Sequence, residues 1–479
     1  AEVTRMRNDG YAVKSDISLN EKLKEVANTE GGNFEAYYQH YRDMMEVATD
    51  SLTAQGIGEE AANAVTRLTD SLKEDAMFFV NANGDVVTYP NSGIRTVIGG
   101  EEAMRMAISL QAATGNIGVK GGSSGGYFSM TLPSPKSGGI DPLSNSTRVS
   151  VPTYEWPDAV IQGKKGGYPS DIKIIYNVGT NYLNQGSDIK KNIEAFNTAE
   201  FSIAHERFMT ATAIHCDVVL PVSTSFERTD IMRGAGNFLL YSKRVVPRLE
   251  GVKHDYEIYS ELARRLGFHE EFTEGRSEEE WLSYFLSESE IIDVEGFKEK
   301  GIYFGEDQER VAFSEFINDP DKSPLNTPSG KIQLYSNEFA MKGAAPIPKL
   351  RPLRPNRDYP LLLVTPKSRH RTHSQNYNIK WFREMDPQKL WISPTDASKR
   401  EIIDGQLVII STPQGKIRIK AYVTEDIMSG VVCLLEGAWP KFVEDVEIQG
   451  SANAVTSTEP TLPSHGSRTH TVHVQVEKA

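Results

Sequence analysis

Residues 172–206 read IKIIYNVGTNYLNQGSDIKKNIEAFNTAEFSIAHE, and this stretch decides the fold class. The apolar run at 172–176 predicts a buried strand, residues 187–197 have the apolar spacing of a helix, and residues 199–206 predict a second strand. A strand, a helix and a second strand in this order are typical of a parallel sheet with helices on its faces. We therefore expect an α/β fold here.

The alternation of strands and helices continues on both sides of this stretch. Downstream, residues 208–215 predict a helix, residues 216–223 a strand and residues 255–267 another helix. Upstream, residues 76–80 predict a short buried strand and residues 101–116 an amphipathic helix.

The last 120 residues have a different pattern, which predicts a separate small β-barrel. Residues 404–423, DGQLVIISTPQGKIRIKAYV, contain two alternating apolar runs joined by PQG, which is typical of a β-hairpin. The apolar runs at 360–366 and 430–439 predict further strands. Residues 341–359 carry four prolines and many basic residues and predict a linker.

Length, charge and hydropathy limit the classes of protein and partner. A chain of 479 residues is too long for one core and predicts about two to four domains. The net charge of −13 argues against nucleic acid or anionic lipid as a ligand of the whole surface, but it is compatible with a local basic pocket. No stretch approaches the roughly 20 apolar residues of a membrane helix, so any membrane association is expected to go through a partner.

The two cysteines and the first residues give little information about the chemistry. Cys216 and Cys433 form neither a disulfide framework nor a metal-ligand spacing, so we expect two apolar cysteines and no iron–sulfur cluster ligated by this chain. The sequence begins AEVTRMRNDG, without an initiator Met or a signal peptide. We interpret this start as a processed product, a fragment, or a sequence that begins inside a longer one.

Amide side chains crowd the loop after the first predicted strand. Residues 177–188, NVGTNYLNQGSD, carry three Asn and one Gln but no nucleophile, histidine or cysteine. Ligands of open α/β sheets bind at the carboxyl ends of strands, and amides offer donors and acceptors to heteroaromatic edges and ribose hydroxyls. Asn and Gln also favour turns for local reasons, so both interpretations stay open. Glu206, at the next strand end, is either a ligand contact or an ordinary acid at a helix N-terminus.

The stretch TPKSRHRTHSQNYN, residues 365–378, concentrates basic and hydroxyl side chains after a predicted strand. In an acidic chain such a cluster predicts contact with a phosphorylated ligand or cofactor. His370 and His373 have a His-x-x-His spacing, but no nearby carboxylate in the sequence completes a metal site, so we expect none. The cluster consists of Lys367, Ser368, Arg369, His370, Arg371, Thr372, His373 and Ser374.

Several other sequence features are weak indicators by themselves. Residues 114–126, TGNIGVKGGSSGG, have the composition of a phosphate loop, but they follow a helix and lack the P-loop spacing, which favours turn and packing roles. Trp439 follows a strand and is expected either in the core or over a flat ligand. Asn453 lies in a short polar segment. Serine hydrolase and kinase motifs do not occur in the sequence.

The order of these motifs resembles the molybdopterin oxidoreductase family that includes dimethyl sulfoxide reductase, and most closely the catalytic subunits of its membrane-anchored bacterial members. The resemblance extends from about residue 75 to the C-terminus, and residues 1–70 match poorly. The motifs in question are TGNIGVKGG, NVGTNYLNQGSD, TATAIHCDVVLP, SFERTD, FTEGRSEEEW, SPLNTPSGKIQLYS, RTHSQNYN, LWISPTDASKREIIDGQLVII, GVVCLLEGAW and VHVQVEK.

This resemblance implies Rossmann-like α/β domains followed by a C-terminal double-psi β-barrel. The cofactor that it implies is bis-molybdopterin guanine dinucleotide with molybdenum or tungsten. The expected domains are a partial α/β domain at 1–125, an α/β dinucleotide-binding domain at 126–340, a Pro-rich linker at 341–359 and a β-barrel molybdopterin dinucleotide-binding domain at 360–479.

The resemblance also divides the candidate residues between the two ends of the cofactor. One guanine dinucleotide is expected to contact Asn177, Thr180, Asn181, Asn184, Gln185 and Glu206, although the family more often has Asp at the last of these positions. The other pterin dinucleotide is expected to contact Lys367, Ser368, Arg371, His373, Ser374 and Asn378. Residues expected near the pterin are Trp439, Asn453 and His470.

The resemblance supplies no metal ligand and no catalytic residue. In the family the first part of the chain carries the iron–sulfur cysteines and the Ser, Cys, Asp or selenocysteine that ligates molybdenum, and this sequence has no counterpart of either. We therefore expect an N-terminal half or a second catalytic polypeptide as a partner. The other expected partners are an iron–sulfur electron-transfer subunit, an anchor subunit as in the membrane-anchored relatives, and a small-molecule substrate, but no nucleic acid.

Two functions follow from these expectations. In the first, the chain is the C-terminal portion of a catalytic subunit for oxygen-atom transfer, such as S-oxide or N-oxide reduction. Its expected location is the periplasm or the extracytoplasmic face of the membrane, with the cytoplasm as the alternative. In the second, the chain is a non-catalytic cofactor-binding or assembly module that has lost the redox centre. The sequence does not predict the substrate.

Overall fold

The computed structural model describes residues 78–80, 86–88, 100–122, 135–141, 150–233, 236–306, 311–349, 356–461 and 465–479. The chain forms two compact units, and each is described by itself. The first consists of Ala1–Phe128, Glu309–Pro355 and Glu459–Thr471. The second consists of Ser129–Gln308, Asn356–Thr458 and Val472–Ala479. Residues 1–77, the end of the glycine-rich stretch at 123–126 and residues 350–355 of the predicted linker lie outside the described ranges.

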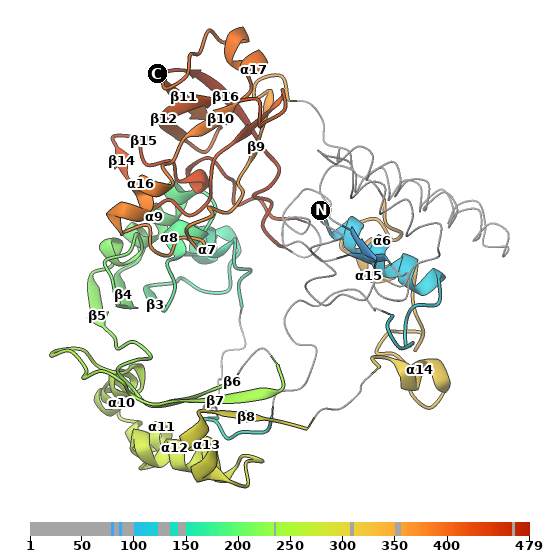
Figure 1. Ribbon diagram of the computed structural model, residues 1–479, viewed down its shortest axis with the longest axis vertical. Helices are drawn as coiled ribbons and strands as arrows, with labels where there is room; N and C mark the ends of the chain where they lie inside the picture. Colours follow the sequence, from blue (N-terminus) through green and yellow to red (C-terminus); the bar gives the residue numbers. More distant parts are fainter. Residues whose placement is uncertain are drawn as a thin grey trace. The chain divides into compact units, whose positions relative to one another are not determined.

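The first unit contains the predicted amphipathic helix as α6 (Gly100–Ala113). Arg105 of α6 lies over the ring of Phe339, 3.9 Å from the ring centroid, and donates to the carbonyl oxygen of Ala345 at 2.8 Å. These contacts hold α15 (Asn337–Met341) against α6 (Figure 1). The other elements of this unit are β1 (Phe78–Val80), β2 (Val86–Thr88) and α14 (Ser314–Asn318).

A three-stranded parallel sheet in the order β3–β4–β5 forms the centre of the α/β part of the second unit. Its strands are β3 (Ile174–Val178), β4 (Phe201–Glu206) and β5 (Val218–Pro221). Asn177 lies opposite Ala204 in the register of β3 and β4. The sheet confirms the α/β prediction for residues 172–206.

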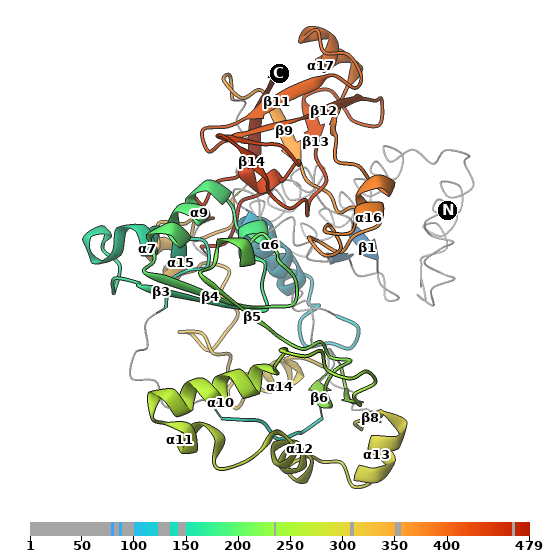
Figure 2. The same ribbon diagram turned by 90° about the vertical axis from the view of Figure 1, so that its left-hand side faces the viewer.

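Helices cover this sheet on both faces. On one face lie α7 (Trp156–Gln162) and α9 (Ile189–Thr198) (Figure 2). Ile175 packs on this face with Leu183 and Phe196. On the opposite face α10 (Asp255–Leu266) stacks Tyr259 beside Tyr176, with 6.1 Å between the ring centroids. Short helical turns before and after these elements are η1 (Gly163–Gly166), α8 (Tyr182–Gln185) and η2 (Ala213–His215).

The helix predicted at 208–215 is wrong, because only the last three residues form a 3-10 turn. Side chains take the backbone donors that a helix would use. The Thr212 N–H donates to Asn181 Oδ1 at 3.2 Å, and the Ala213 N–H donates to Thr210 Oγ1 at 3.2 Å. Such side-chain bonds compete with helical ones.

An antiparallel sheet in the order β6–β7–β8 follows in the second unit. Its core contains Leu239, Leu286, Ile291 and Phe297, all buried. The elements of this region are β6 (Asp230–Arg233), β7 (Phe238–Ser242), α11 (His269–Thr273), α12 (Glu278–Ser287), α13 (Val294–Lys300) and β8 (Ile302–Phe304).

Six strands close into a barrel in the order β10–β13–β9–β16–β11–β12, because β12 also pairs with β10. The predicted hairpin is the antiparallel pair of β11 and β12, and alternate residues of β12 point into the core. The strands are β9 (Leu361–Val364), β10 (Leu390–Ile392), β11 (Leu407–Ser411), β12 (Lys416–Val423), β13 (Val431–Cys433) and β16 (Val472–Lys478). Outside the barrel lie α16 (Lys380–Met385), α17 (Pro394–Lys399), β14 (Phe442–Val443), β15 (Val446–Glu447) and η3 (Ala452–Ala454).

The barrel and the parallel sheet share packing within the second unit. Ile189, the first residue of α9, is fully buried in the barrel core, together with Val455. Two residues further, Lys191 Nζ lies 3.1 Å from Asp158 and donates to Thr458 Oγ1 at 2.7 Å. Helix α9 therefore packs against the barrel core through Ile189 and Ile193 and against the core beside the parallel sheet through Ile193 and Phe196.

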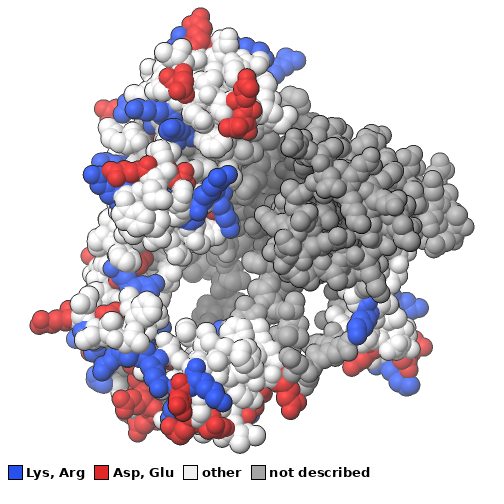
Figure 3. All heavy atoms as spheres, in the orientation of Figure 1, with Lys and Arg blue, Asp and Glu red and all other residues white. Residues whose placement is uncertain are grey.

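Charge and hydropathy of the described surface add two observations. Acidic and basic side chains lie next to one another over the barrel and over α10–α13, so the net negative charge is not gathered into one patch on this face (Figure 3). Within the described ranges, no helix combines the length and the apolar character that a membrane crossing requires. The domain boundaries expected at 125, 340 and 360 stay predictions.

Candidate functional site

The amide loop, residues 177–188, begins at the carboxyl end of β3, next to the carboxyl end of β4. The Gly179 N–H points to the carbonyl oxygen of His205 at 3.5 Å. Gly179 has a φ of 63°, a conformation that favours glycine and turns the chain away from the sheet. The loop therefore lies where ligands bind in open α/β sheets.

Hydrogen bonds within the loop give it one defined shape. The Asn177 amide donates to the Thr180 carbonyl oxygen at 2.8 Å, and the Thr180 hydroxyl donates to Gln185 Oε1 at 3.2 Å. Asn181 is buried, and its Oδ1 accepts from the Thr212 hydroxyl at 3.1 Å. The amides thus serve as turn formers, as one of the two interpretations requires. They do not use all their donors in this way.

The loop is joined to the barrel by two further amides. Asn184 Nδ2 donates to the carbonyl oxygen of Ala438 at 2.5 Å. Asn453 Nδ2 donates to the carbonyl oxygens of Asn184 and Gln185 at 2.8 and 3.2 Å. Asn453 was a weak candidate in the sequence, and the structure brings it to the amide loop across 268 residues of chain.

The basic loop, residues 365–378, lies against the same segment of the barrel. Trp439 Nε1 donates to the carbonyl oxygen of Ser374 at 2.8 Å. A Cβ on Gly437 would lie 2.0 Å from the carbonyl oxygen of His373, so only glycine allows this approach. The segment 437–439 therefore contacts the basic loop on one side and the amide loop on the other, and it brings these two predicted stretches to one place.

Arg371 is the side chain in this region whose environment is least complete. The residue is 5% exposed, and its Nε, Nη1 and Nη2 atoms have no hydrogen-bond partner among the described residues. Its guanidinium carbon lies 5.1 Å from the ring centroid of Tyr377, and burial lowers the pKa of Arg371. A buried cation without hydrogen bonds is costly unless an anion completes its surroundings.

Two carboxylates in this region were missed by sequence reasoning. Asp386 accepts a short hydrogen bond from the Ser368 hydroxyl and lies 3.9 Å from His370 Nδ1. Glu436 Oε1 lies 2.9 Å from His373 Nδ1. Sequence reasoning missed these acids because each lies far along the chain from its histidine and neither belongs to a recognisable motif. Each histidine has its own acid, and the described residues contain no cluster of three or more metal-ligating side chains.

Glu447 is a further residue that the sequence did not indicate. Its carboxylate is fully buried and accepts four backbone N–H groups at 2.7–3.1 Å. Burial raises its pKa, against the effect of these hydrogen bonds. The acid fixes the segment 441–451, which connects Trp439 to Asn453. The sequence gives no signal for it, because Glu447 lies beside two other acids, Glu444 and Asp445.

The remaining residues that the sequence predicted for the site make few contacts with the amide loop or the segment 437–439. Glu206 accepts from the Arg207 N–H at 2.8 Å at the end of β4, where a turn follows instead of a helix. Lys367 and Asn378 are exposed in the basic loop. His470 belongs to the first unit and is not part of the arrangement described here. The described glycines of the stretch 114–126 include Gly115, Gly118 and Gly121, with φ of 72–82°, which fits the turn roles expected for them.

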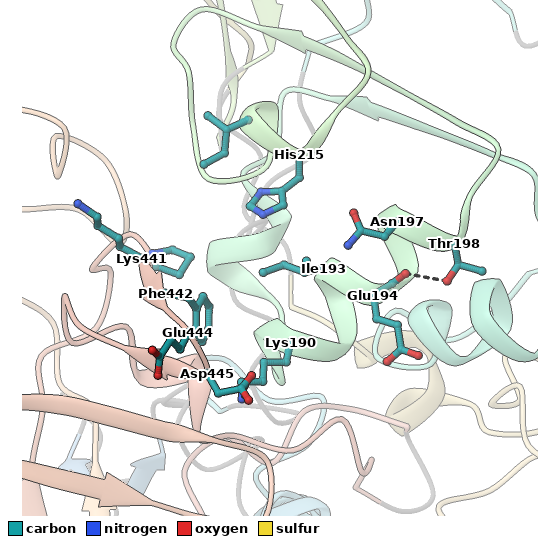
Figure 4. Close-up of a pocket in the computed structure, with 12 residues that line it drawn as sticks. Lys190, Ile193, Glu194, Asn197, Thr198, His215, Lys441, Phe442, Glu444 and Asp445 are labelled. Atoms are coloured by element: carbon teal, nitrogen blue, oxygen red, sulfur yellow. Dashed lines mark hydrogen bonds and ion pairs between the residues drawn. The ribbon is translucent and has the colours of Figure 1, made fainter.

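A cavity of about 700 Å³ lies beside this region but does not include it. Figure 4 shows its walls, formed by α9, by η2 and by the hairpin of β14 and β15. Lys190 Nζ and Asp445 Oδ1 form an ion pair at 3.2 Å in its wall. The lining residues are Lys190, Ile193, Glu194, Asn197, Thr198, Ile214, His215, Pro440, Lys441, Phe442, Glu444 and Asp445, none of which is a predicted site residue.

Comparisons with known families cover most of the chain. Residues 23–265 match the molybdopterin oxidoreductase family, and residues 361–472 match the molybdopterin dinucleotide-binding domain. The chain therefore belongs to the molybdopterin oxidoreductase family. The dinucleotide-binding domain implies a molybdopterin cofactor with its metal.

Several reductases of this family are similar to the chain in sequence. The dimethyl sulfoxide reductase of Escherichia coli (strain K12) is 34% identical over 79% of this chain and 52% of its own length. The trimethylamine-N-oxide reductase of Haemophilus influenzae is 33% identical over 79% of this chain and 53% of its own length. The biotin sulfoxide reductase of Cereibacter sphaeroides is 31% identical over 79% and 56%. The chain thus spans about half the length of these relatives.

A solved structure supports the fold. Acetylene hydratase from Pelobacter acetylenicus superimposes with a TM-score of 0.56 and 19% sequence identity, over 67% of this chain and 46% of that chain. At this identity the likeness concerns the fold alone.

The residues present fit a molybdopterin dinucleotide. The buried Arg371 guanidinium has no hydrogen-bond partner among the described residues, although the charge of Asp386 acts on it, and phosphate is the anion that such a planar donor set matches. Asn181 Nδ2 is a second buried donor without a hydrogen bond among the described residues, and it belongs to the loop at the strand ends. A phosphate and a heteroaromatic ring would complete the two environments.

Proposed function

We propose that this chain is the C-terminal portion of the catalytic subunit of a molybdenum or tungsten oxidoreductase that carries bis-molybdopterin guanine dinucleotide. The observation that carries the proposal is Arg371, a buried guanidinium that makes no hydrogen bond to any described residue, in a loop joined through 437–439 to the amide loop. Burying a cation in this way is unfavourable in the absence of an anion, and the dinucleotide provides phosphates.

The two loops divide the cofactor between them in this proposal. Asn177, Thr180, Asn181, Asn184, Gln185 and Glu206 hold one guanine dinucleotide, and Lys367, Ser368, Arg371, His373, Ser374 and Asn378 hold the other pterin dinucleotide. Trp439 and Asn453 lie near the pterin in this proposal, and the role expected for His470 stays a prediction from the sequence. The bound group supplies two-electron oxygen-atom transfer at its metal. The residues of this chain neutralise phosphate charge, orient the nucleotide ends and exclude water around them.

The substrate class follows from the relatives. Their names point to S-oxides and N-oxides, and we propose a reduction of this kind for the complete enzyme. Since the chain spans about half of those proteins, we propose that an N-terminal half or a second polypeptide supplies the metal ligand and the iron–sulfur cluster. An iron–sulfur electron-transfer subunit, a membrane anchor subunit and a periplasmic location complete the proposal.

The finer description of the fold belongs to the same proposal. We propose the double-psi connectivity for the six-stranded barrel and a Rossmann-like origin for the parallel sheet. The predicted domains at 1–125, 126–340 and 360–479, with the linker at 341–359, would then be the natural divisions of the chain.

Metal and pterin analysis of the purified protein, with any polypeptide that accompanies it, tests the proposal. We expect stoichiometric molybdenum or tungsten and two pterins per complex. Arg371→Met should lower the pterin content severalfold, and Arg369→Met, in an exposed position of the same loop, should not. A folded protein that lacks metal, pterin and partner in its native host would contradict the enzyme. Pterin without metal would favour a cofactor-binding or assembly module.

A further inference from the structure

Three side chains form a hydrogen-bonded triad beneath the ends of β3 and β4, and only its central member is fully buried. His205 of β4 is fully buried. Its Nδ1 lies 2.8 Å from Asp255 Oδ1, and its Nε2 lies 2.8 Å from the hydroxyl oxygen of Tyr176. The ring of Tyr259 from α10 stacks beside Tyr176, with 6.1 Å between the centroids, and lies tilted against His205 at 5.2 Å. None of these residues belongs to the loops described above.

The chemistry of the three groups sets the direction of the hydrogen bonds. We assign the Nδ1–H tautomer to His205, in which Nδ1 donates to the carboxylate, which only accepts, and Nε2 is an acceptor. The Tyr176 hydroxyl therefore donates to Nε2, and burial raises the pKa of Tyr176, which keeps the phenol protonated. Arg228 Nη1 lies 3.6 Å from the other oxygen of Asp255. The triad is an ordered series from α10 through β4 to β3.

The triad is connected directly to the candidate site. Tyr176 precedes Asn177, and His205 precedes Glu206. Adjacent residues of a strand point to opposite faces, so the triad holds the two strand ends on the α10 face while Asn177 and Glu206 point to the other. The carbonyl oxygen of His205 also accepts from the N–H of Gly179, where the amide loop begins.

We propose that Tyr176, His205 and Asp255 are positioning residues for the nucleotide end that the amide loop binds. This inference rests on the proposed function. The hydrogen bond between β3 and β4 side chains fixes the position of Asn177 relative to Glu206 before the ligand arrives. Without it, the strand ends and the loop have more conformations to lose on binding, and this loss lowers the affinity.

Binding of guanosine diphosphate to the full chain, followed by calorimetry, tests the inference. The amide-loop site is identified as the one that Gln185→Leu weakens, since Gln185 is exposed in this loop. Tyr176→Phe removes only the hydroxyl and should weaken this site about three- to tenfold, the effect of one buried hydrogen bond. Tyr259→Phe is the matched control, because it keeps the stacked ring and removes a hydroxyl outside the triad.

Three further measurements show whether the triad positions the nucleotide site or only stabilises the fold. Leu239→Ala, in the core of the antiparallel sheet, should lower the Tm without changing the affinity for guanosine diphosphate. His205→Gln keeps an acceptor near the position of Nε2 and should restore part of the affinity, whereas His205→Asn is too short to reach Tyr176. Nitrogen NMR of His205 should report the Nδ1–H tautomer in the wild type.

The outcomes also distinguish a failure of the proposed nucleotide site from a failure of the proposed positioning role. If the wild-type chain does not bind guanosine diphosphate, the proposed nucleotide site is wrong, and the inference fails with it. If the wild type binds and Tyr176→Phe binds equally well, only the positioning role is overturned. The same holds if His205→Gln and His205→Asn weaken binding to the same extent, or if the NMR signals show the Nε2–H tautomer.

Discussion

At the scale of single residues, the site is defined by buried polar atoms that have no hydrogen-bond partner among the described residues. Most amides of the loop 177–188 are satisfied by local bonds, and these bonds alone would explain a turn. Among the described residues, buried polar atoms of the two loops without a hydrogen bond are Asn181 Nδ2 and Ser187 Oγ in the amide loop and the whole guanidinium of Arg371 in the basic loop. Buried donors without acceptors are unusual in folded proteins, and each points to a group that binds there.

Arg371 leads to a prediction in which stability and binding change in opposite directions. Arg371→Met should raise the free energy of unfolding of the cofactor-free chain by about 1–3 kcal/mol, because it removes buried donors that are not satisfied. The same variant should bind less pterin. Thermal or denaturant unfolding of the apoprotein, together with pterin analysis, measures both effects. A lower stability of the apoprotein would mean that other groups already satisfy the guanidinium.

Glu227 gives a prediction on pH. Its carboxylate accepts from the Thr224 N–H at 2.7 Å and from the Leu249 N–H at 3.1 Å, and these backbone bonds lower its pKa. Since the folded-state pKa is lowered, the stabilisation is present above the unfolded-state pKa and is lost as the pH falls through the folded-state pKa.

The measurement compares the Tm of the wild type and of Glu227→Gln over the acidic range. The wild type should be more stable near pH 7, and the difference should shrink as the pH falls below the ordinary range of glutamate. A difference that does not depend on pH would assign the effect to the shape of the side chain instead of its charge.

At the scale of elements, the strands and the hairpin could be predicted from the spacing of their apolar residues, because each strand buries one or both of its faces. The helix predicted at 208–215 failed for a reason that lies elsewhere in the chain, since Asn181 takes the Thr212 N–H. The link between the amide loop and the basic loop was equally invisible, because it depends on backbone carbonyls of Ala438 and Ser374. Side-chain types predicted the two loops, but their contacts with distant backbone atoms could not be predicted.

Helix α9 supports a prediction at this scale. Ile189→Ala removes a fully buried side chain at the junction of helix and barrel and should lower the free energy of unfolding by about 2–5 kcal/mol. Ile292→Ala, at a side chain that is 99% exposed, is the control and should change it by less than about 0.5 kcal/mol. Equal effects in urea unfolding would show that Ile189 is not part of the barrel core in solution.

At the scale of the whole molecule, the second unit contains both loops, so one chain should offer two places for a guanine nucleotide. We expect calorimetric titration with guanosine diphosphate to give a stoichiometry near two, and adenosine diphosphate to bind much more weakly. Ligand binding should raise the Tm by mass action. At a ligand concentration one hundred times the Kd, each occupied site should add about 2.7 kcal/mol to the free energy of unfolding. A stoichiometry of one would leave a single nucleotide end on this chain.

The burial of Ile189 in the barrel has a consequence for how such a gene could divide or recombine. A breakpoint anywhere between α9 and β9 would separate Ile189 from the barrel core, whose other buried residues all lie between Leu361 and Val476. Fission or domain shuffling at that junction would leave a gap in the core unless the two products reassociated. The barrel core is therefore complete only together with the start of α9.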